Sequence, residues 1–312
     1  MNANDMPTNR VAIIGAGGIG GYLAADLVRA GRDVTLCVRQ PIETVSVTSG
    51  AEIREVRVAS VIDPAAMPHV RWVLVTTKAQ DTAGAAPWLA AARGATIVVV
   101  QNGIDHLERV RPIAPDAPIL PAIIYCGVER TGPGRIVHHG GARMVVPAGA
   151  DGAAFAALFA GTSFEIVEDQ DFETAAWRKL LSNLVVNPIS ALTLRRAAVF
   201  REERVRDLAA GLLEEAVAVA AAAGAKLGPA DVDRVLANLS ALRADAGSSM
   251  LYDRLAGRPL EHEFLTGAVV RAAERNGIPV PLNRAILALL DVSSGRPLDA
   301  SNSSLEHRNP PG

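Results

Sequence analysis

The chain is poor in cysteine and in net charge, and each shortage excludes a class of function. Only Cys37 and Cys126 occur among the 312 residues, far apart and outside any CxxC or metal-ligand spacing. We therefore expect two buried thiols rather than a disulfide or a zinc site. The formal net charge is only −2, which provides no basic field for phosphate backbones. Nucleic acid is therefore not an expected partner.

Targeting and membrane-spanning signals are also missing from the sequence. The N-terminal MNANDMPTNR lacks the charged and apolar regions of a signal peptide. Apart from alanine-rich helix, no apolar run reaches roughly 18 residues free of charges. We therefore expect neither secretion nor a membrane partner, and the cytoplasm is the expected compartment.

The length and apolar content of the chain are typical of a protein with two domains. Its 312 residues are 49% hydrophobic, enough to bury a sizeable core. From Arg10 to about Glu168, glycine-bounded helical patterns alternate with short β-branched runs, namely VAIIG, DVTLCV, WVLVTT, ATIVVVQ and PILPAII. That alternation predicts a parallel sheet with crossover helices.

Later segments depart from this alternation. In RTGPGRIVHHGGARMVVP, residues 130–147, closely spaced glycines and alternating apolar residues predict a small antiparallel addition, expected to extend the edge of the sheet. After Asp169 only helical patterns follow, at residues 171–195, 201–223, 229–242, 247–256, 261–276 and 282–292. The predicted fold is α/β, with an N-terminal Rossmann domain at residues 1–168 and an all-helical domain at residues 169–293. The Ser-, Pro- and Asn-rich tail, residues 294–312, is expected to be disordered.

The segment VAIIGAGGIGGYLAADLVRAG predicts a dinucleotide-binding turn. It places Gly15, Gly17 and Gly20 after a strand and at the start of a helix, with Gly18 and Ile19 in the same turn. Glycines there allow a tight turn and close approach of a pyrophosphate, and the helix N-terminus supplies amide donors. A lone GxGxxG is a weak signal, but the flanking strand, helix and second strand DVTLCV strengthen it. The alternative is a glycine-rich turn without a ligand.

Three polar residues after later strands extend this prediction to a cofactor crevice. The second strand ends in CVRQP, where Arg39 replaces the acidic residue that binds the ribose hydroxyls of NAD, and arginine favours the 2′-phosphate of NADP(H). Lys78 in VTTKAQD and Asn102 in VVVQNGID follow strands at the carboxyl edge of the sheet, where such folds bind ligands. The alternatives are a solvated surface charge at Arg39 and ordinary loop chemistry at the other two residues.

The segment WRKLLSNLVVNPISAL, residues 177–192, predicts a mostly apolar helix with a polar stripe. Lys179, Asn183 and Asn187 recur every four residues and so lie on one face. Burying a lysine and two amides is costly unless something meets them. Reduction of a ketone by hydride needs an acid for the developing alkoxide and donors that orient the substrate, and these side chains suit both tasks. Alternatively, the lysine reaches solvent and the amides bond the backbone near Pro188.

Six segments together resemble the ketopantoate reductase family, also called 2-dehydropantoate 2-reductases. They are, in order, GAGGIG, TTKAQD, QNGI, GPGRIVH, WRKLLSNLVVNPISAL and SSMLYDRLAGRPLEHEF, and the match spans roughly residues 10–292. The resemblance implies an N-terminal Rossmann domain, a C-terminal helical domain and NADPH-dependent reduction of ketopantoate in pantothenate synthesis. It implies a small-molecule 2-oxo acid as the partner and is compatible with a homodimer.

The resemblance also implies roles for individual residues. Lys179 matches the family's catalytic lysine and Glu261 its essential glutamate. Asn183, Asn187 and Ser249 match positions that contact the substrate. Asp253 matches the aspartate that follows the serine pair. Lys78 and Asn102 match residues at the cleft for cofactor and substrate.

The sequence departs from the family pattern just after Glu261. Where the family often has E-I-D-Y-I-N-G, this chain has EHEFLTG, with His262 for an apolar residue, Glu263 for Asp and Thr266 for Asn. These changes bear on the substrate more than on the reaction. They leave open a reductase of a different oxo or imino compound, and a sensor that binds NADP(H) without turnover is a further alternative.

The histidines do not predict a metal site. His138 and His139 are adjacent, so on a strand their side chains point to opposite faces, and no third ligand accompanies them or His262 in the sequence. We therefore expect no metal.

Overall fold

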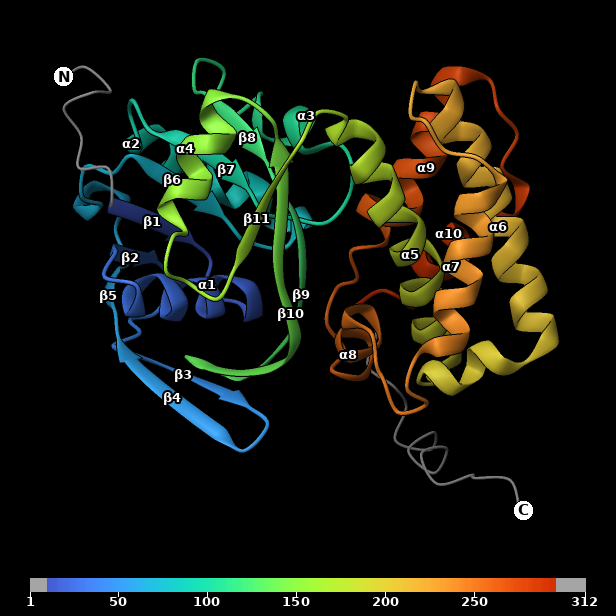
Figure 1. Ribbon diagram of the computed structural model, residues 1–312, viewed down its shortest axis with the longest axis horizontal. Helices are drawn as coiled ribbons and strands as arrows, with labels where there is room; N and C mark the ends of the chain where they lie inside the picture. Colours follow the sequence, from blue (N-terminus) through green and yellow to red (C-terminus); the bar gives the residue numbers. More distant parts are fainter. Residues whose placement is uncertain (1–9, 296–312) are drawn as a thin grey trace. The chain divides into compact units, whose positions relative to one another are not determined.

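The first part of the chain is built on a parallel sheet. The computed structural model describes residues 10–295, and the chain divides into two compact units between Ala176 and Trp177. In the first unit a six-stranded sheet has the order β5-β2-β1-β6-β7-β8 (Figure 1). Its strands are β1 (Arg10–Ile14), β2 (Asp33–Cys37), β5 (Ala59–Val61), β6 (Trp72–Val75), β7 (Thr96–Val99) and β8 (Ile119–Pro121). All neighbouring pairs are parallel, which confirms the predicted sheet.

A second sheet corrects one expectation. Strands β9 (Ile123–Gly132) and β10 (Arg135–Pro147) form the predicted antiparallel pair. They do not extend the parallel sheet, because the other edge of β10 is occupied by β3 (Thr44–Ser49) and then by β11 (Glu165–Asp169). Strand β4 (Glu52–Arg57) completes this five-stranded sheet by pairing with β3. The expected extension of the sheet edge was therefore wrong.

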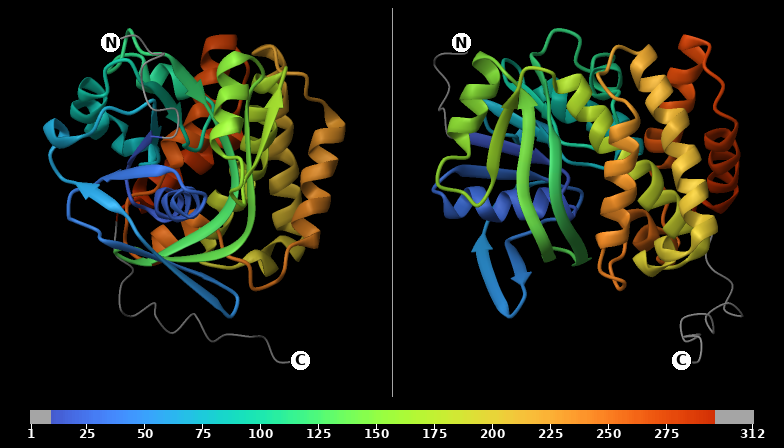
Figure 2. Two further views of the ribbon diagram at one scale, coloured as in Figure 1. Left: turned by 60° about the vertical axis from the view of Figure 1, so that its left-hand side comes forward. Right: turned by 45° about the vertical axis from the view of Figure 1, so that its right-hand side comes forward.

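Two apolar cores cover the two faces of the parallel sheet. On one face, helix α1 (Gly18–Arg29) lies between the two sheets, and Phe155 of α4 (Ala150–Leu158) packs beside it against Trp72, with ring centroids 5.5 Å apart. On the other face lie α2 (Ala86–Ala91) and α3 (His106–Val110). The 3-10 segments η2 (Pro64–Ala66) and η3 (Ala79–Ala85) belong to the connections. Figure 2 shows α1 nearly end-on in its left view, with the second sheet curving around it.

The second unit is helical within the described residues, as predicted. Its helices are α5 (Phe172–Thr193), α6 (Glu203–Ala222), α7 (Pro229–Ala241), α8 (Ser249–Leu255), α9 (His262–Asn276) and α10 (Pro281–Ser293), with η4 (Ala197–Arg201) after α5. Each boundary lies within two residues of the prediction. The first residues of α5 belong to the first unit, where Ala175 and Ala176 pack with Ile123 and Val145. No helix among residues 10–295 combines the length and apolar character needed to cross a membrane.

One residue fixes the start of α10. Glu215 of α6 accepts hydrogen bonds from the backbone N–H groups of Leu282 and Asn283, at 2.9 and 3.0 Å. The Glu215 carboxylate therefore accepts from N–H groups in the first turn of α10 that have no acceptor within the helix. Its negative charge also interacts favourably with the positive end of the helix dipole. Of the tail predicted to be disordered, residues 296–312 lie outside the described residues.

Candidate functional site

The glycine turn brings α1 unusually close to the end of β1. Gly15 has a φ of +97°, a conformation that L side chains rarely adopt. A Cβ atom on Gly20 would lie 1.9 Å from the carbonyl oxygen of Gly15 and 2.4 Å from Oγ1 of Thr76. Thr76 Oγ1 donates to that same carbonyl at 2.7 Å. Glycine at positions 15 and 20 is therefore required by the turn and by the packing of helix on strand.

The start of α1 fits the diphosphate of a dinucleotide. Gly17 is the N-cap residue, makes no side-chain cap, and has open space where a Cβ atom would lie. Gly18 and Ile19 follow in the first turn, and the first helical bond closes later, from Gly21 N–H to Gly17 C=O. The earlier amides are thus donors without helical acceptors, at the positive end of the helix dipole. An anionic ligand would therefore fit at this end of the helix.

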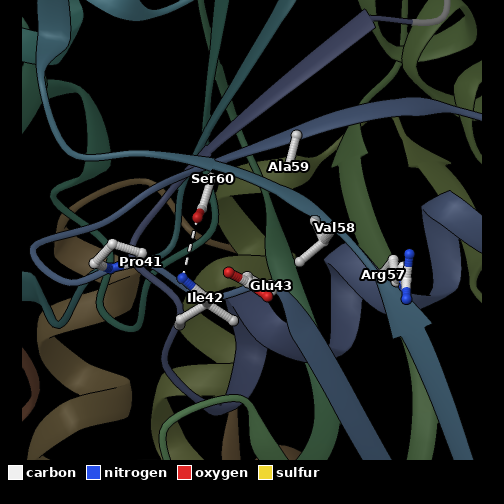
Figure 3. Close-up of a pocket in the computed structure, with 7 residues that line it drawn as sticks. All are labelled: Pro41, Ile42, Glu43, Arg57, Val58, Ala59 and Ser60. Atoms are coloured by element: carbon white, nitrogen blue, oxygen red, sulfur yellow. Dashed lines mark hydrogen bonds between the residues drawn. The ribbon is translucent and has the colours of Figure 1, made fainter.

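Arg39 is exposed two residues beyond β2, in reach of solvent. A shallow groove of about 500 Å³ lies just after it in the chain, between the β2–β3 connection and the turn into β5. Figure 3 shows Ile42 and Ser60 joined across this groove by a hydrogen bond of 3.0 Å from the Ile42 N–H. The groove is lined by Pro41, Ile42, Glu43, Arg57, Val58, Ala59 and Ser60, and none of these was predicted to bind cofactor or substrate.

The loops that carry Lys78 and Asn102 are joined at the carboxyl edge of the sheet. Because β6 and β7 are paired neighbours, the residues that follow them emerge side by side. Gln101 fixes both loops, since its Nε2 donates to the carbonyl and the hydroxyl of Thr77 at 3.0 and 3.1 Å. Its Oε1 accepts from Thr82 at 3.2 Å. The fold thus brings the two predicted loops together, and Gln101 is the residue that joins them.

Beneath Asn102 lies a buried neutral histidine. His106 Nε2 donates to the Gln101 carbonyl at 2.9 Å, and Arg109 donates to the Asn102 carbonyl at 3.0 Å. Burial, with the nearby positive charge of Arg109, lowers the pKa of His106 to about 4. The ring is therefore neutral at pH 7 and serves as a fixed hydrogen-bond donor. It supports the turn at Gly103, whose φ is +100°.

In the helical unit, α5 carries the predicted polar stripe. Lys179 and Asn183 are half-buried and Asn187 is buried, all at four-residue spacing on this helix. Burial lowers the pKa of Lys179 below its ordinary range. A lowered pKa makes the ammonium group a stronger acid, so it gives up its proton more readily.

The side chain of Asn187 is hydrogen-bonded to the first turn of helix α8. Its Oδ1 accepts from Ser249 Oγ at 3.2 Å and from the Met250 N–H at 3.3 Å. One helical turn along the stripe, Ser190 Oγ lies 2.6 Å from Ser248 Oγ, which caps α8 by accepting from the Leu251 N–H at 3.0 Å. The stripe on α5 therefore fixes the start of α8, and the structure brings Asn187 and Ser249 together as predicted partners of one site.

Glu261 is a buried carboxylate at the start of α9. It is 5% exposed and occupies the N-cap position, where its side chain makes no capping bond to its own helix. The connection that leads to it is fixed at Asp253 of α8, which accepts from Arg258 Nε at 2.9 Å, and whose carbonyl accepts from the Arg258 N–H. The start of α9 is thus where the sequence suggested, and its carboxylate is not used as a cap.

Three positioning residues were missed from the sequence: Gln101, Ser190 and Ser248. The first directly precedes the Asn-Gly turn, and Ser190 continues the stripe at a spacing of three residues from Asn187. These signals were present, since helical spacing alone places Ser190 on the same face. Ser248 is the N-cap residue before the predicted α8, a position where serine is preferred.

The cysteines and histidines are also accounted for. Both cysteines are free thiols, and burial raises the pKa of each to about 12. The adjacent histidines have separate partners: His138 contacts Ser49 and the Gly141 carbonyl, and His139 contacts Glu129. Elsewhere, possible metal-ligand atoms of His262, Glu263 and Asp291 lie within 4.8 Å of one another. The sequence does not indicate this group, because Asp291 is far from the other two residues along the chain.

Comparison with known sequences gives matches over most of the chain. The family model described as ketopantoate reductase PanE/ApbA matches residues 11–151, and its C-terminal counterpart matches residues 171–293. The 2-dehydropantoate 2-reductase of Caulobacter vibrioides is 37% identical over 290 residues, which cover 91% of this chain and 99% of that protein. The enzyme of the same name from Mycobacterium tuberculosis is 34% identical, over 92% of this chain and 98% of its own length.

Solved structures share the fold. A ketopantoate reductase of the PanE/ApbA family from Ralstonia eutropha has a TM-score of 0.84 and 31% identity, covering 91% of this chain and 98% of that one. A D-mandelate dehydrogenase bound to NADH and anilino(oxo)acetate has a TM-score of 0.80 at 19% identity, covering 91% of this chain and 97% of its own. At that identity the likeness shows the fold alone.

The buried His106 predicts an acid-sensitive fold. The unfolded chain binds a proton at this residue with a pKa near 6.5 and the folded protein only near 4. Between those values the unfolded state holds more protons, so stability falls as pH falls. From pH 7 to pH 5, we expect His106 to account for a loss of about 2 kcal/mol in the free energy of unfolding.

Urea denaturation at both pH values measures this loss. His106→Gln should lose correspondingly less stability than the wild type on acidification, while His139→Gln, at an exposed histidine, should follow the wild type. An identical loss in wild type and His106→Gln would contradict the assignment.

Proposed function

Because the chain belongs to the ketopantoate reductase family, we propose that it reduces 2-dehydropantoate to pantoate with NADPH, a step of pantothenate synthesis. The family resemblance of the six sequence segments is thereby confirmed. The observation that carries the proposal is Lys179, a lysine of lowered pKa on a stripe with two amides. We further propose a small-molecule 2-oxo acid as the partner, a cytoplasmic location, and a homodimer as the assembly.

The first unit is proposed to hold the cofactor, within residues 1–168. The amides at Gly17, Gly18 and Ile19 would bind the diphosphate, and the glycines at positions 15 and 20 keep the turn narrow enough for that approach. Arg39 would pair with the 2′-phosphate, since its guanidinium is exposed where an acid would select NAD. When bound, NADPH supplies the hydride. Lys78 and Asn102 would lie at the reacting end, on loops joined by Gln101.

The predicted helical domain, residues 169–293, is proposed to bind and protonate the substrate with residues of the second unit, which begins at Trp177. Lys179 holds a proton on Nζ and gives it to the oxygen that becomes the hydroxyl group. Its positive charge also stabilises that oxygen as negative charge develops. Asn183 and Ser249 orient the substrate, with Asn187 fixing Ser249 in place. Glu261 is proposed to bind a substrate hydroxyl or to orient the lysine.

Two alternatives remain proposals of lower support. A different oxo or imino substrate is suggested by the departures from the family pattern at His262, Glu263 and Thr266. A sensor that binds NADP(H) without turnover is disfavoured, because Lys179 and Glu261 are both present and both at least partly buried.

The substrate is tested by following NADPH oxidation with ketopantoate and with a panel of other 2-oxo acids and imines. We expect ketopantoate to be reduced to pantoate with the highest kcat/KM of the panel. Turnover of another compound without turnover of ketopantoate would keep the family and remove the named substrate. Binding of NADPH with no turnover of any compound would favour the sensor.

The cofactor preference depends on Arg39. We expect kcat/KM for NADPH to exceed that for NADH by at least about tenfold, equivalent to about 1.4 kcal/mol. Arg39→Asp should abolish this preference, because the carboxylate repels the 2′-phosphate and accepts from the ribose hydroxyls. Steady-state kinetics with both cofactors measure it. Equal efficiency of the wild type with NADH and NADPH would show that Arg39 is a solvated surface charge.

The proton donor is tested at Lys179. Lys179→Ala should lower kcat by roughly 10²- to 10⁴-fold, the usual contribution of general-acid catalysis, while the Kd of NADPH changes little. Lys179→Met is the matched variant, because it retains the aliphatic stem and removes only the charge. It should have the same low kcat and an unchanged or raised Tm, since the ammonium group no longer has to be buried. A folded Lys179→Met enzyme with wild-type kcat would make the stripe purely structural.

A further inference from the structure

Both residues that flank Glu261 are bonded to the C-terminal end of α10, one to Asp291 and one to the C-cap residue Ser294. On one side, the Leu260 N–H donates to Ser294 Oγ at 3.0 Å. On the other, His262 Nε2 lies 2.9 Å from Asp291 Oδ1. Asp291 and Ser294 are three positions apart and so lie on one face of that helical end. The buried carboxylate is therefore held between two ties to a single element.

The His262 ring bridges two acceptors. Its Nδ1 lies 3.1 Å from the Leu260 carbonyl, so the ring also closes the loop around Glu261. The His262 side chain is 9% exposed and that of Asp291 is 51% exposed. The tie therefore joins a buried ring to a surface carboxylate.

Asp291 is the acidic residue of α10 that contacts the His262 ring. The other acidic residues beside the ring are its sequence neighbours Glu261 and Glu263, and Glu263 is itself paired with Arg271 at 3.1 Å. The ring is thus held between the Leu260 carbonyl and the Asp291 carboxylate.

We infer that the end of α10 is the positioning element for Glu261, and that His262 and Asp291 are positioning residues that act through it. The inference rests on the proposed function, in which Glu261 contacts the substrate or the catalytic lysine. With the tie intact, residues 260 and 262 cannot move independently of α10, so the direction of the Glu261 carboxylate is set before substrate arrives. Preorganisation of this kind is what a supporting shell contributes to a site.

The experiment compares kcat and KM for ketopantoate, the Kd of NADPH and the Tm across matched variants. His262→Ile places the apolar residue that the family often has, and Asp291→Ala removes its partner. Each should lower kcat/KM by about tenfold through loss of positioning, with the rise in KM exceeding the fall in kcat and with Kd unchanged. The double variant should be no worse than either single one, because both break the same tie.

Two further variants separate positioning from stability. Glu274→Gln breaks the α9–α10 ion pair with Arg284, which measures 2.9 Å and involves the opposite end of α9. It should leave kcat/KM unchanged whatever it does to the Tm. In a Glu261→Ala background, His262→Ile should add no further loss, because it acts only through that carboxylate.

Failure of the positioning role and failure of the proposed reductase function give different results. Impaired Glu261→Ala with wild-type kcat/KM in His262→Ile would overturn the inference alone, as would a full additional loss in the Glu261→Ala background. If EDTA abolished the activity of the wild type but not that of His262→Ile, then His262, Glu263 and Asp291 would bind a cation. That result would also overturn the inference. Wild-type kinetics in Glu261→Ala, or no turnover of ketopantoate by the wild type, would overturn the proposed function first.

Discussion

Polar side chains on a largely buried helix must each find a partner, and this constraint organises the helical unit. Helix α5 presents Asn187 and Ser190 among apolar residues, and both bond to the first turn of α8. The same helix presents Asn183 about one turn and Lys179 about two turns before Asn187. Desolvation of an unpaired amide costs more than a hydrogen bond gains, and the buried Oδ1 of Asn187 has its partners in α8. The row of residues proposed to act on the substrate is therefore also the row that packs α5 against α8.

The first unit meets the opposite requirement. There the chain must remove side chains so that backbone groups can approach one another and a ligand. The carbonyl of Gly15 accepts from Thr76 and lies where a Cβ atom of residue 20 would be. This contact sets the distance of α1 from the sheet and hence the direction of its free amides. Lys78 and Asn102 gain their place from the same sheet, because neighbouring parallel strands end at one edge.

The sequence predicted what depends on local periodicity and failed where the partner is distant. The parallel strands follow from short β-branched runs and the helices from a 3.6-residue period, and the bounds of the helices in the second unit agree within two residues. Strands β3 and β4 were missed because TVSVTS and EIREVR are rich in polar residues and partly exposed. Their stability comes from pairing, of β3 with β10 and of β4 with β3. The bond from Asn187 to Ser249 spans 62 positions and that from His262 to Asp291 spans 29, so neither has a local signal.

The departures after Glu261 are better explained by these distant partners than by a change of substrate. His262 bonds to Asp291 and to the Leu260 carbonyl, and Glu263 is exposed and paired with Arg271, so both side chains are engaged within the helical unit. An apolar residue at position 262 would need no carboxylate at position 291, so the two positions are physically coupled. Thr266 is fully buried, and nothing in the structure explains its hydroxyl. Of three departures that suggested another substrate, two are accounted for by packing within the protein, which strengthens the case for ketopantoate.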